Sequence, residues 1–239
     1  MILEVCVDDA DGLAAAVEGG ADRIELCSAL ALGGLTPSPG LIKQAVDCPV
    51  PVYAMIRPRS GDFVYSETAI RSMMDDIDCI RNHGLDGVVF GASLPDGRLD
   101  AEVLTALSSR AEGMGRTLHR AFDLVPEFDK AIDLAVRLGF ERILTSGGAV
   151  TAPGGLAALH AITAYARDRI AIMPGAGINA ANVADVLCIE GINEIHASCS
   201  MEIKVSGGPA RKLGFETPGR RATATEIVRN LKHAIAHPR

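Results

Sequence analysis

Ionisable and soft side chains recur at alternate positions of several short apolar segments of this sequence. If residues 2–7 form a strand, Glu4 and Cys6 point to the same face, because successive side chains of a strand alternate. The next segment places three polar or soft residues on one face in the same way, namely Arg23, Glu25 and Cys27. Later segments add Tyr53, Met55, Arg57, Thr117, His119, Glu194, His196 and Ser198. Isolated buried charges are costly, so these groups must pair with one another, meet a ligand or see water.

Carboxylates and an imidazole in this set are candidates for general acid–base chemistry. Asp123 follows His119 by four residues and can orient either His119 or Arg120. The predicted catalytic residues are Glu4, Glu25, His119 and Asp123. Clusters of perturbed charges often mark functional sites. The alternative is a purely structural network of ion pairs, for instance between Arg23 and Glu25.

Glycine-rich and basic segments point to an anion. Thr145-Ser-Gly-Gly148 and Pro174-Gly-Ala-Gly-Ile-Asn179 follow two late apolar segments, and glycine lets backbone N–H groups approach an anion closely. Arginines 57 and 59 can bind a carboxylate or phosphate through charge-assisted hydrogen bonds. The predicted anion-binding residues are Arg57, Arg59, Ser146, Gly147, Gly148, Gly175, Gly177 and Ser198. The alternative is that tight turns simply need glycine at these places.

A repeated signature indicates which elements position these residues. It has a glycine, an apolar residue, a short polar stretch and then a β-branched residue, and it occurs four times: at 20–24, 84–88, 139–143 and 191–195. Glycine commonly ends a helix, and a β-branched residue suits a buried strand. Its spacings of 64, 55 and 52 residues leave room for one further strand and helix between neighbours. Eight such units predict a parallel α/β fold, a (β/α)8 TIM barrel with its site at the C-terminal mouth of the strands.

Length and composition favour one domain. A chain of 239 residues with 48% hydrophobic content matches the size of roughly 250 residues typical of such a barrel. We expect a single domain over 1–239, with a core of about 1–200, a variable loop at 199–221 and a helix at 223–236. An open doubly wound sheet is disfavoured because no GxGxxG motif follows the first strand.

Charge and cysteine usage restrict the partners and the compartment. A net charge of −7 without a basic block argues against nucleic acid and anionic membranes as partners. No apolar run approaches the roughly 20 residues of a membrane helix, and no signal peptide is recognisable. Six scattered cysteines without a CxxC pair indicate reduced thiols, so we expect a cytoplasmic protein.

Many short motifs in order resemble the CutC family of copper homeostasis proteins. They include Gly33-Gly-Leu-Thr-Pro-Ser38, Met55-Ile-Arg-Pro-Arg59, His119-Arg-Ala-Phe-Asp123 and Glu194-Ile-His-Ala-Ser198. The resemblance runs from residue 2 to about 200, and it implies an oligomeric, cytoplasmic TIM barrel with a copper(I) role. It also implies copper binding through cysteines that align with Cys6 and Cys27.

Elementary chemistry permits that copper site. Soft thiolates favour copper(I), and neighbouring strands lie about 4.8 Å apart. Met55 on the following strand is a candidate third soft ligand. The alternative is that both cysteines are small buried hydrophobic residues.

Three hypotheses for function follow. The first is copper homeostasis through copper(I) binding, with a copper ion as the partner. The second is a TIM-barrel enzyme for a small anionic metabolite, such as a phosphorylated sugar, with a divalent-metal site built from Glu and His at the mouth as a subsidiary version. The sequence does not decide whether the chain is an enzyme. The third is a scaffold that assembles through its outer helices, although a scaffold gives no reason for charges inside the barrel. In each case we expect a homo-oligomer, a dimer or larger.

Overall fold

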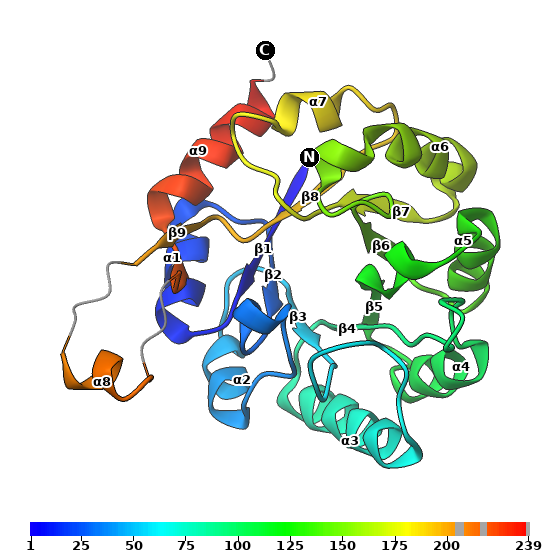
Figure 1. The fold of residues 1–239 in the computed structure, drawn as a ribbon, viewed down its shortest axis with the longest axis horizontal. Coiled ribbons are helices and arrows are strands. Elements are labelled where there is room, and N and C mark those ends of the chain that lie inside the picture. Colours follow the sequence, from blue (N-terminus) through cyan, green and yellow to red (C-terminus); the bar gives the residue numbers. More distant parts are fainter. Residues whose placement is uncertain (204–207, 216–218, 238–239) are drawn as a thin grey trace.

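Eight parallel strands form the centre of the computed structural model, which describes residues 1–203, 208–215 and 219–237. Neighbouring strands pair in the order β7-β6-β5-β4-β3-β2-β1-β8, and the two end strands, β7 and β8, also lie side by side. The strands are β1 (Ile2–Val7), β2 (Arg23–Leu26), β3 (Val52–Met55), β4 (Gly87–Phe90), β5 (Gly115–Leu118), β6 (Arg142–Thr145), β7 (Ala171–Pro174) and β8 (Glu194–Ala197). The sheet thus forms a nearly closed barrel, and the predicted TIM-barrel fold is confirmed (Figure 1).

Helices surround this barrel on the outside (Figure 1). The α-helices of the barrel are α1 (Ala10–Gly19), α2 (Pro39–Ala45), α3 (Glu67–His83), α4 (Ala101–Arg110), α5 (Phe128–Arg137), α6 (Leu156–Ala166), α7 (Val183–Leu187) and α9 (Thr225–Ala236). Short 3-10 helices lie in the loops: η1 (Leu30–Leu32), η2 (Arg120–Leu124), η3 (Ala152–Gly155) and η4 (Arg167–Arg169).

Local sequence explains where several helices begin and end. The Asp9 side chain caps α1 by accepting from the Gly12 amide, and the Ser66 hydroxyl caps α3 by accepting from the Ala69 amide. Gly20 and Gly84 end these two helices with φ values of 93° and 79°, in the left-handed region that favours glycine. The helix-ending role predicted for the repeated glycine is therefore confirmed at both positions.

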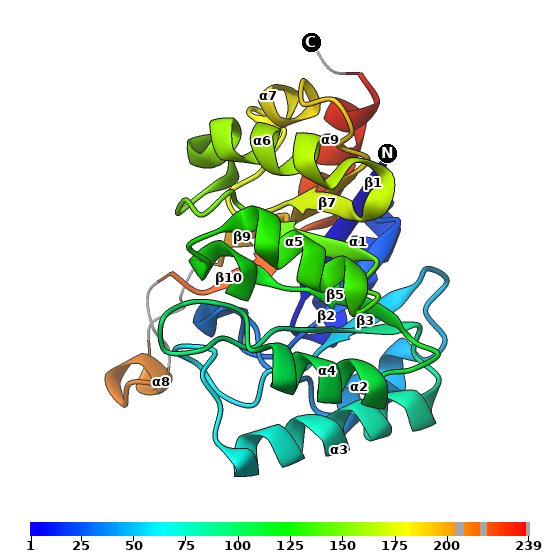
Figure 2. The ribbon, with the colours of Figure 1, turned by 90° about the vertical axis from the view of Figure 1, so that its right-hand side faces the viewer.

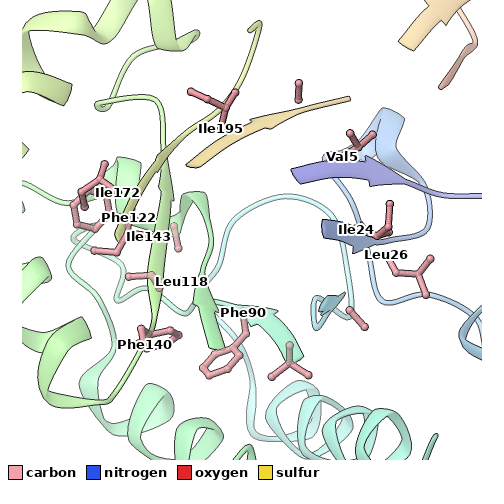
Figure 3. Close-up of a cluster of buried hydrophobic side chains, with 14 of the residues drawn as sticks. Val5, Ile24, Leu26, Phe90, Leu118, Phe122, Phe140, Ile143, Ile172 and Ile195 are labelled. Atoms are coloured by element: carbon pink, nitrogen blue, oxygen red, sulfur yellow. The ribbon is translucent and has the colours of Figure 1, made fainter. Parts of the chain in front are cut away.

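The hydrophobic core lies between the barrel and its helices. Figure 3 shows apolar side chains of the strands, among them Val5, Ile24 and Ile143, that point away from the barrel axis. The Phe90 and Phe140 rings meet there with centroids 5.0 Å apart. Since the apolar faces of the strands pack outward, the alternate positions must fill the barrel interior, and these are the polar residues identified from the sequence.

Residues 199–221, expected to be a variable loop, carry short elements of their own. They include β9 (Ser200–Glu202) and α8 (Pro209–Lys212), and β10 (Arg221–Thr223) pairs with β9 in antiparallel fashion. Figures 1 and 2 both show α8 away from the barrel. The helix expected at 223–236 is α9; it begins two residues later, at Thr225, and packs against α1. No helix in the described part of the chain is long and apolar enough to cross a membrane.

Candidate functional site

Ion pairs fill the N-terminal end of the barrel interior. The Arg23 guanidinium pairs with both Glu4 and Glu194, and Arg142 Nε lies 3.0 Å from Glu194 Oε2. All four side chains are buried. A structural ion-pair network therefore exists, but among the described residues Arg23 pairs with Glu4 and Glu194, and not with Glu25 as the sequence suggested. Facing strands explain this, because the strand register places Glu4 directly opposite Arg23.

The network continues upward to an imidazole. His196 Nδ1 lies 2.8 Å from Glu4 Oε1. Burial alone would raise the pKa of Glu4, but the hydrogen bond to His196 and the charge of Arg23 lower it to about 2. Glu4 is therefore an anion that holds Nδ1 of His196, and the other ring nitrogen, Nε2, faces away from it.

Three donor groups of different chemistry converge above this pair. The Cys6 thiol, a Glu25 carboxylate oxygen and a His196 ring nitrogen all lie within 4.8 Å of one another, and all three residues are buried. Glu25 Oε2 is 3.8 Å from His196 Nε2. Metal–ligand bonds of about 2.0–2.3 Å allow two donors of one ion to stand about 4.5 Å apart, so small shifts would let one ion reach all three.

Mutual interactions change the protonation of this cluster. Burial raises the pKa of Glu25; the charge of His196 partly offsets this rise, and the charge of Glu4 adds to it. Burial would lower the pKa of His196, but Cys6, Glu25 and Glu4 together raise it well above its usual value. These neighbours favour the doubly protonated form of His196 in the metal-free cluster, and a metal ion bound at Nε2 would replace the proton there.

Cys27 lies beside this cluster and not in it. Its Sγ is 3.5 Å from Glu25 Oε2, and the residue is completely buried against Tyr53, Met55 and Val89. Burial, followed by the charge of Glu25, raises the pKa of the Cys27 thiol well above its usual value. Of the two predicted copper ligands, Cys6 lines a cavity, whereas Cys27 is covered.

A cavity of about 270 Å³ opens above the cluster at the C-terminal ends of the strands. Its walls are largely apolar and include Leu30, Met55, Phe63, Leu144 and Ile178. Its polar lining consists of Cys6, Glu25, Arg57, His119, Arg120, His196 and Ser198. Apolar walls with a few convergent polar groups are typical of small-molecule sites.

His119 contributes a fixed tautomer to this cavity. Its Nδ1 accepts the Ala121 amide at 3.2 Å and caps η2, so the ring proton is on Nε2. Burial, and then the positive charge of Arg57, lower the pKa of His119 to about 3. The ring is therefore neutral at pH 7. Its buried Nε2–H finds no acceptor among the described residues.

The pKa of His119 predicts how stability responds to acid. An unfolded histidine takes up a proton near pH 6.5, whereas folded His119 does so near pH 3. Above pH 6.5 the histidine is neutral in both the folded and the unfolded state. Between pH 6.5 and 3 only the unfolded state binds the proton, so the contribution of His119 to the free energy of unfolding falls by about 1.4 kcal/mol for each unit by which the pH is lowered. The variant His119→Asn keeps an acceptor for Ala121 and removes this dependence. Urea unfolding of both proteins at pH 7, 6 and 5 checks it, and equal slopes would contradict the prediction.

The glycine loop after β6 surrounds a carboxylate of the protein itself. Asp123 accepts hydrogen bonds from the amides of Ser146 and Gly148, at 3.0 and 3.1 Å, and from the side chains of Thr145 and Ser146. Arg120 Nε donates to the same carboxylate at 2.7 Å. The sequence predicted that Asp123 orients either His119 or Arg120, and in the structure it binds Arg120. The predicted anion-binding loop already holds an anion.

The other predicted anion-binding residues differ in where they lie. Gly177 and Ser198 line the cavity. The Gly147 amide donates to Thr145 Oγ1, and Gly175 packs so closely on Leu144 and His196 that a Cβ would lie 2.5 Å from the leucine. Arg59 is half exposed and pairs with Asp62 at 2.6 Å, outside the cavity.

Two residues near the site were not predicted from the sequence. Arg142 is the fourth residue of the signature at 139–143, as Arg23 is of the signature at 20–24. The repeat could therefore have indicated that Arg142 joins the buried ion pairs. Cys199 is buried beyond the end of β8. Burial, together with Cys6, raises the pKa of its thiol to about 12. No spacing in the sequence marks this cysteine.

Comparison with known proteins identifies the family. The model of the CutC family matches residues 1–201. The chain belongs to the CutC family. A CutC family protein of Sinorhizobium medicae is 56% identical over 235 residues, covering 98% of this chain and 96% of the relative, and one of Caulobacter vibrioides is 49% identical over 239 residues, covering 98% and 97%.

A solved CutC structure has the same fold. The putative copper homeostasis protein CutC of Streptococcus agalactiae is 33% identical, with a TM-score of 0.79, and the match covers 83% of this chain and 98% of that one. Thiamine phosphate pyrophosphorylase of Pyrococcus furiosus, 16% identical with a TM-score of 0.60, shares the barrel alone; the match covers 98% of this chain and 95% of that one.

Proposed function

We propose that this CutC chain serves copper homeostasis by binding copper(I) through Cys6 and His196, with Glu25 as a weaker third ligand. The observation that carries the proposal is the orientation of His196. Its Nδ1 is held by Glu4, which leaves Nε2 toward Glu25 and Cys6. Histidines that bind metals usually have their second nitrogen fixed in this way by a carboxylate.

The donor set suits a soft ion. A thiolate favours copper(I), and an imidazole is compatible with it, whereas a hard ion such as Mg²⁺ would need more oxygen ligands. The three donor residues are buried at the floor of the cavity, so only one side of a bound ion would face competing ligands. Cys27 contacts the carboxylate of Glu25 but is not itself one of the three converging donors. Copper binding by the thiol pair Cys6 and Cys27 therefore stays a prediction, and the experiment below addresses it.

Anaerobic titration of copper(I) against a chromophoric competitor tests the proposal. We expect Cys6→Ser to weaken copper(I) binding by about 100-fold or more, because it removes the softest donor. Cys27→Ser should change the affinity little, and Cys188→Ser, at an exposed cysteine, is the matched control.

Two outcomes would decide against this site. Unchanged affinity in Cys6→Ser would exclude the thiol as a ligand. An equal loss in Cys6→Ser and Cys27→Ser would support the thiol pair in place of Cys6 and His196.

An enzyme acting on a small anionic metabolite is the second candidate function, and the cavity favours it. Glu25 and His119 line the cavity, so they can touch a substrate. Glu4 is occupied by Arg23 and His196, and Asp123 by its loop, so these two would act only through other residues. Location in the cytoplasm and assembly into a homo-oligomer stay predictions.

A further inference from the structure

The cavity is larger than a metal ion needs. A bound water occupies about 30 Å³ of liquid volume, and a bare ion less, whereas the cavity measures about 270 Å³. Small-molecule sites begin near this size, at about 300 Å³. Metal binding at the floor therefore leaves most of the cavity, with its apolar walls, without a role.

Arg57 brings a positive charge to the cavity wall. The residue is 6% exposed, and its guanidinium donates to the carbonyl oxygens of Leu32, Gly34 and Gly61 at 2.8–3.1 Å. No carboxylate of the described residues forms an ion pair with it. A buried charge held by carbonyl dipoles and the Phe63 ring, without a carboxylate, is costly to desolvate, so an anion beside it would be stabilising.

Arg57 and His119 each keep a buried donor without a partner among the described residues. A guanidinium has five N–H groups, and three of Arg57 are occupied, which leaves Nε–H and one N–H of Nη2. The His119 Nε2–H is also open. Both side chains contact Phe63: the Arg57 guanidinium carbon lies 5.0 Å from the ring centroid, and the His119 ring centroid lies 4.7 Å from it.

We propose that this cavity binds a small organic monocarboxylate. Its carboxylate oxygens accept hydrogen bonds from Arg57 and from the Nε2–H of His119, after a small shift of the side chains that cover these buried donors. Its apolar body lies against Leu30, Leu144 and Ile178. The Nε and Nη2 edge of a guanidinium matches the two oxygens of a carboxylate.

Charge selects a monoanion over a phosphate dianion. The other cations of the lining have carboxylate partners: Arg120 pairs with Asp123, and His196 with Glu4. Arg57 is thus the lining cation without a carboxylate partner among the described residues, and the Glu25 carboxyl group in the same lining adds no positive charge for a second negative charge on the ligand. The glycine loop that would suit a phosphate is filled by Asp123.

The monocarboxylate is a ligand class for the second candidate function, the enzyme, and the proposal rests on that function only because both use the same cavity. Binding is measured on metal-free protein and without turnover. Failure here would therefore leave copper binding and catalysis to their own experiments.

Isothermal titration of the metal-free full chain with 4-methylpentanoate tests the proposal. We expect one site per chain. Binding of 4-methylpentanamide should be at least roughly tenfold weaker because it loses the charge-assisted hydrogen bond, and binding of inorganic phosphate at least roughly tenfold weaker because it has no apolar body to bury. The comparison of carboxylate with amide needs no variant, so it holds even if a variant fails to fold.

Two variants locate the site. His119→Asn keeps the cap on Ala121 and removes the Nε2–H, so it should weaken 4-methylpentanoate binding at least roughly tenfold. Arg71→Ala, a charge change at an exposed position of α3, should leave binding unchanged. No binding at millimolar carboxylate, equal binding of acid and amide, tighter binding of phosphate, or unchanged binding in His119→Asn would each overturn the proposal.

Discussion

Replacement of Glu4 by glutamine is expected to lower the free energy of unfolding by about 3–5 kcal/mol. Glu4 is completely buried and joins Arg23 to His196. Glutamine has almost the same shape, so the loss is electrostatic: Arg23 keeps Glu194 but loses one of its two carboxylates. Removing one partner of a buried ion pair costs this much because the remaining charge stays desolvated.

Urea unfolding at pH 7 measures the effect, and the midpoint of thermal unfolding should fall by roughly 6–20 °C for a chain of this size. Glu18→Gln is the matched control, because the Glu18 side chain is 71% exposed and its ion pair with Arg229 is long, at 3.8 Å. A loss below about 1 kcal/mol, the size of a surface pair, would show that the network does not stabilise the barrel.

The second large effect concerns Tyr53, which lies across the barrel floor. A Cβ on Gly115 would stand 2.1 Å from Tyr53 Oη and 2.6 Å from Cζ. The ring cannot move freely, because its hydroxyl donates to Glu141 at 2.8 Å and the Arg142 guanidinium lies 4.7 Å from its centroid. Gly115→Ala should therefore cost about 3 kcal/mol, the upper part of the range for overpacked cores.

The free energies of unfolding of Gly115→Ala, Tyr53→Leu and the double variant show whether the loss in Gly115→Ala comes from a steric conflict with Tyr53. Leucine frees the space that the new methyl group needs, so the double variant should lose less stability than the sum of the two single changes. Gly40→Ala is the control, since its Cβ would have its nearest contact at 3.9 Å. Additive losses would mean that the contact with Tyr53 is not the cause.

The barrel could be predicted because its information is local and repeated. Each signature joins a helix-ending glycine to a buried strand, and Gly20 and Gly84 adopt the left-handed conformation that this requires. Alternation along each strand then assigned the inward face, and Glu4, Glu25 and His196 are indeed buried there.

Pairing inside the barrel could not be predicted in the same way. Arg23 could meet Glu4, Glu25 or Glu194, and only the register of the closed barrel distinguishes them. The glycine loop after β6 was predicted to bind an external anion. Asp123 lies 23 residues before Ser146, so no local pattern reveals that its carboxylate is there.

The bond between Glu4 and His196 spans 192 residues of sequence, and this separation restricts the order of folding. Contacts so distant along the chain form late, because the entropy of closing the loop must be overcome first. The thiol of Cys6 and the imidazole of His196 therefore meet only when β8 pairs with β1. A nascent chain that still lacks β8 does not yet have both proposed copper ligands together, so capture of an ion at this place would have to wait until the barrel closes.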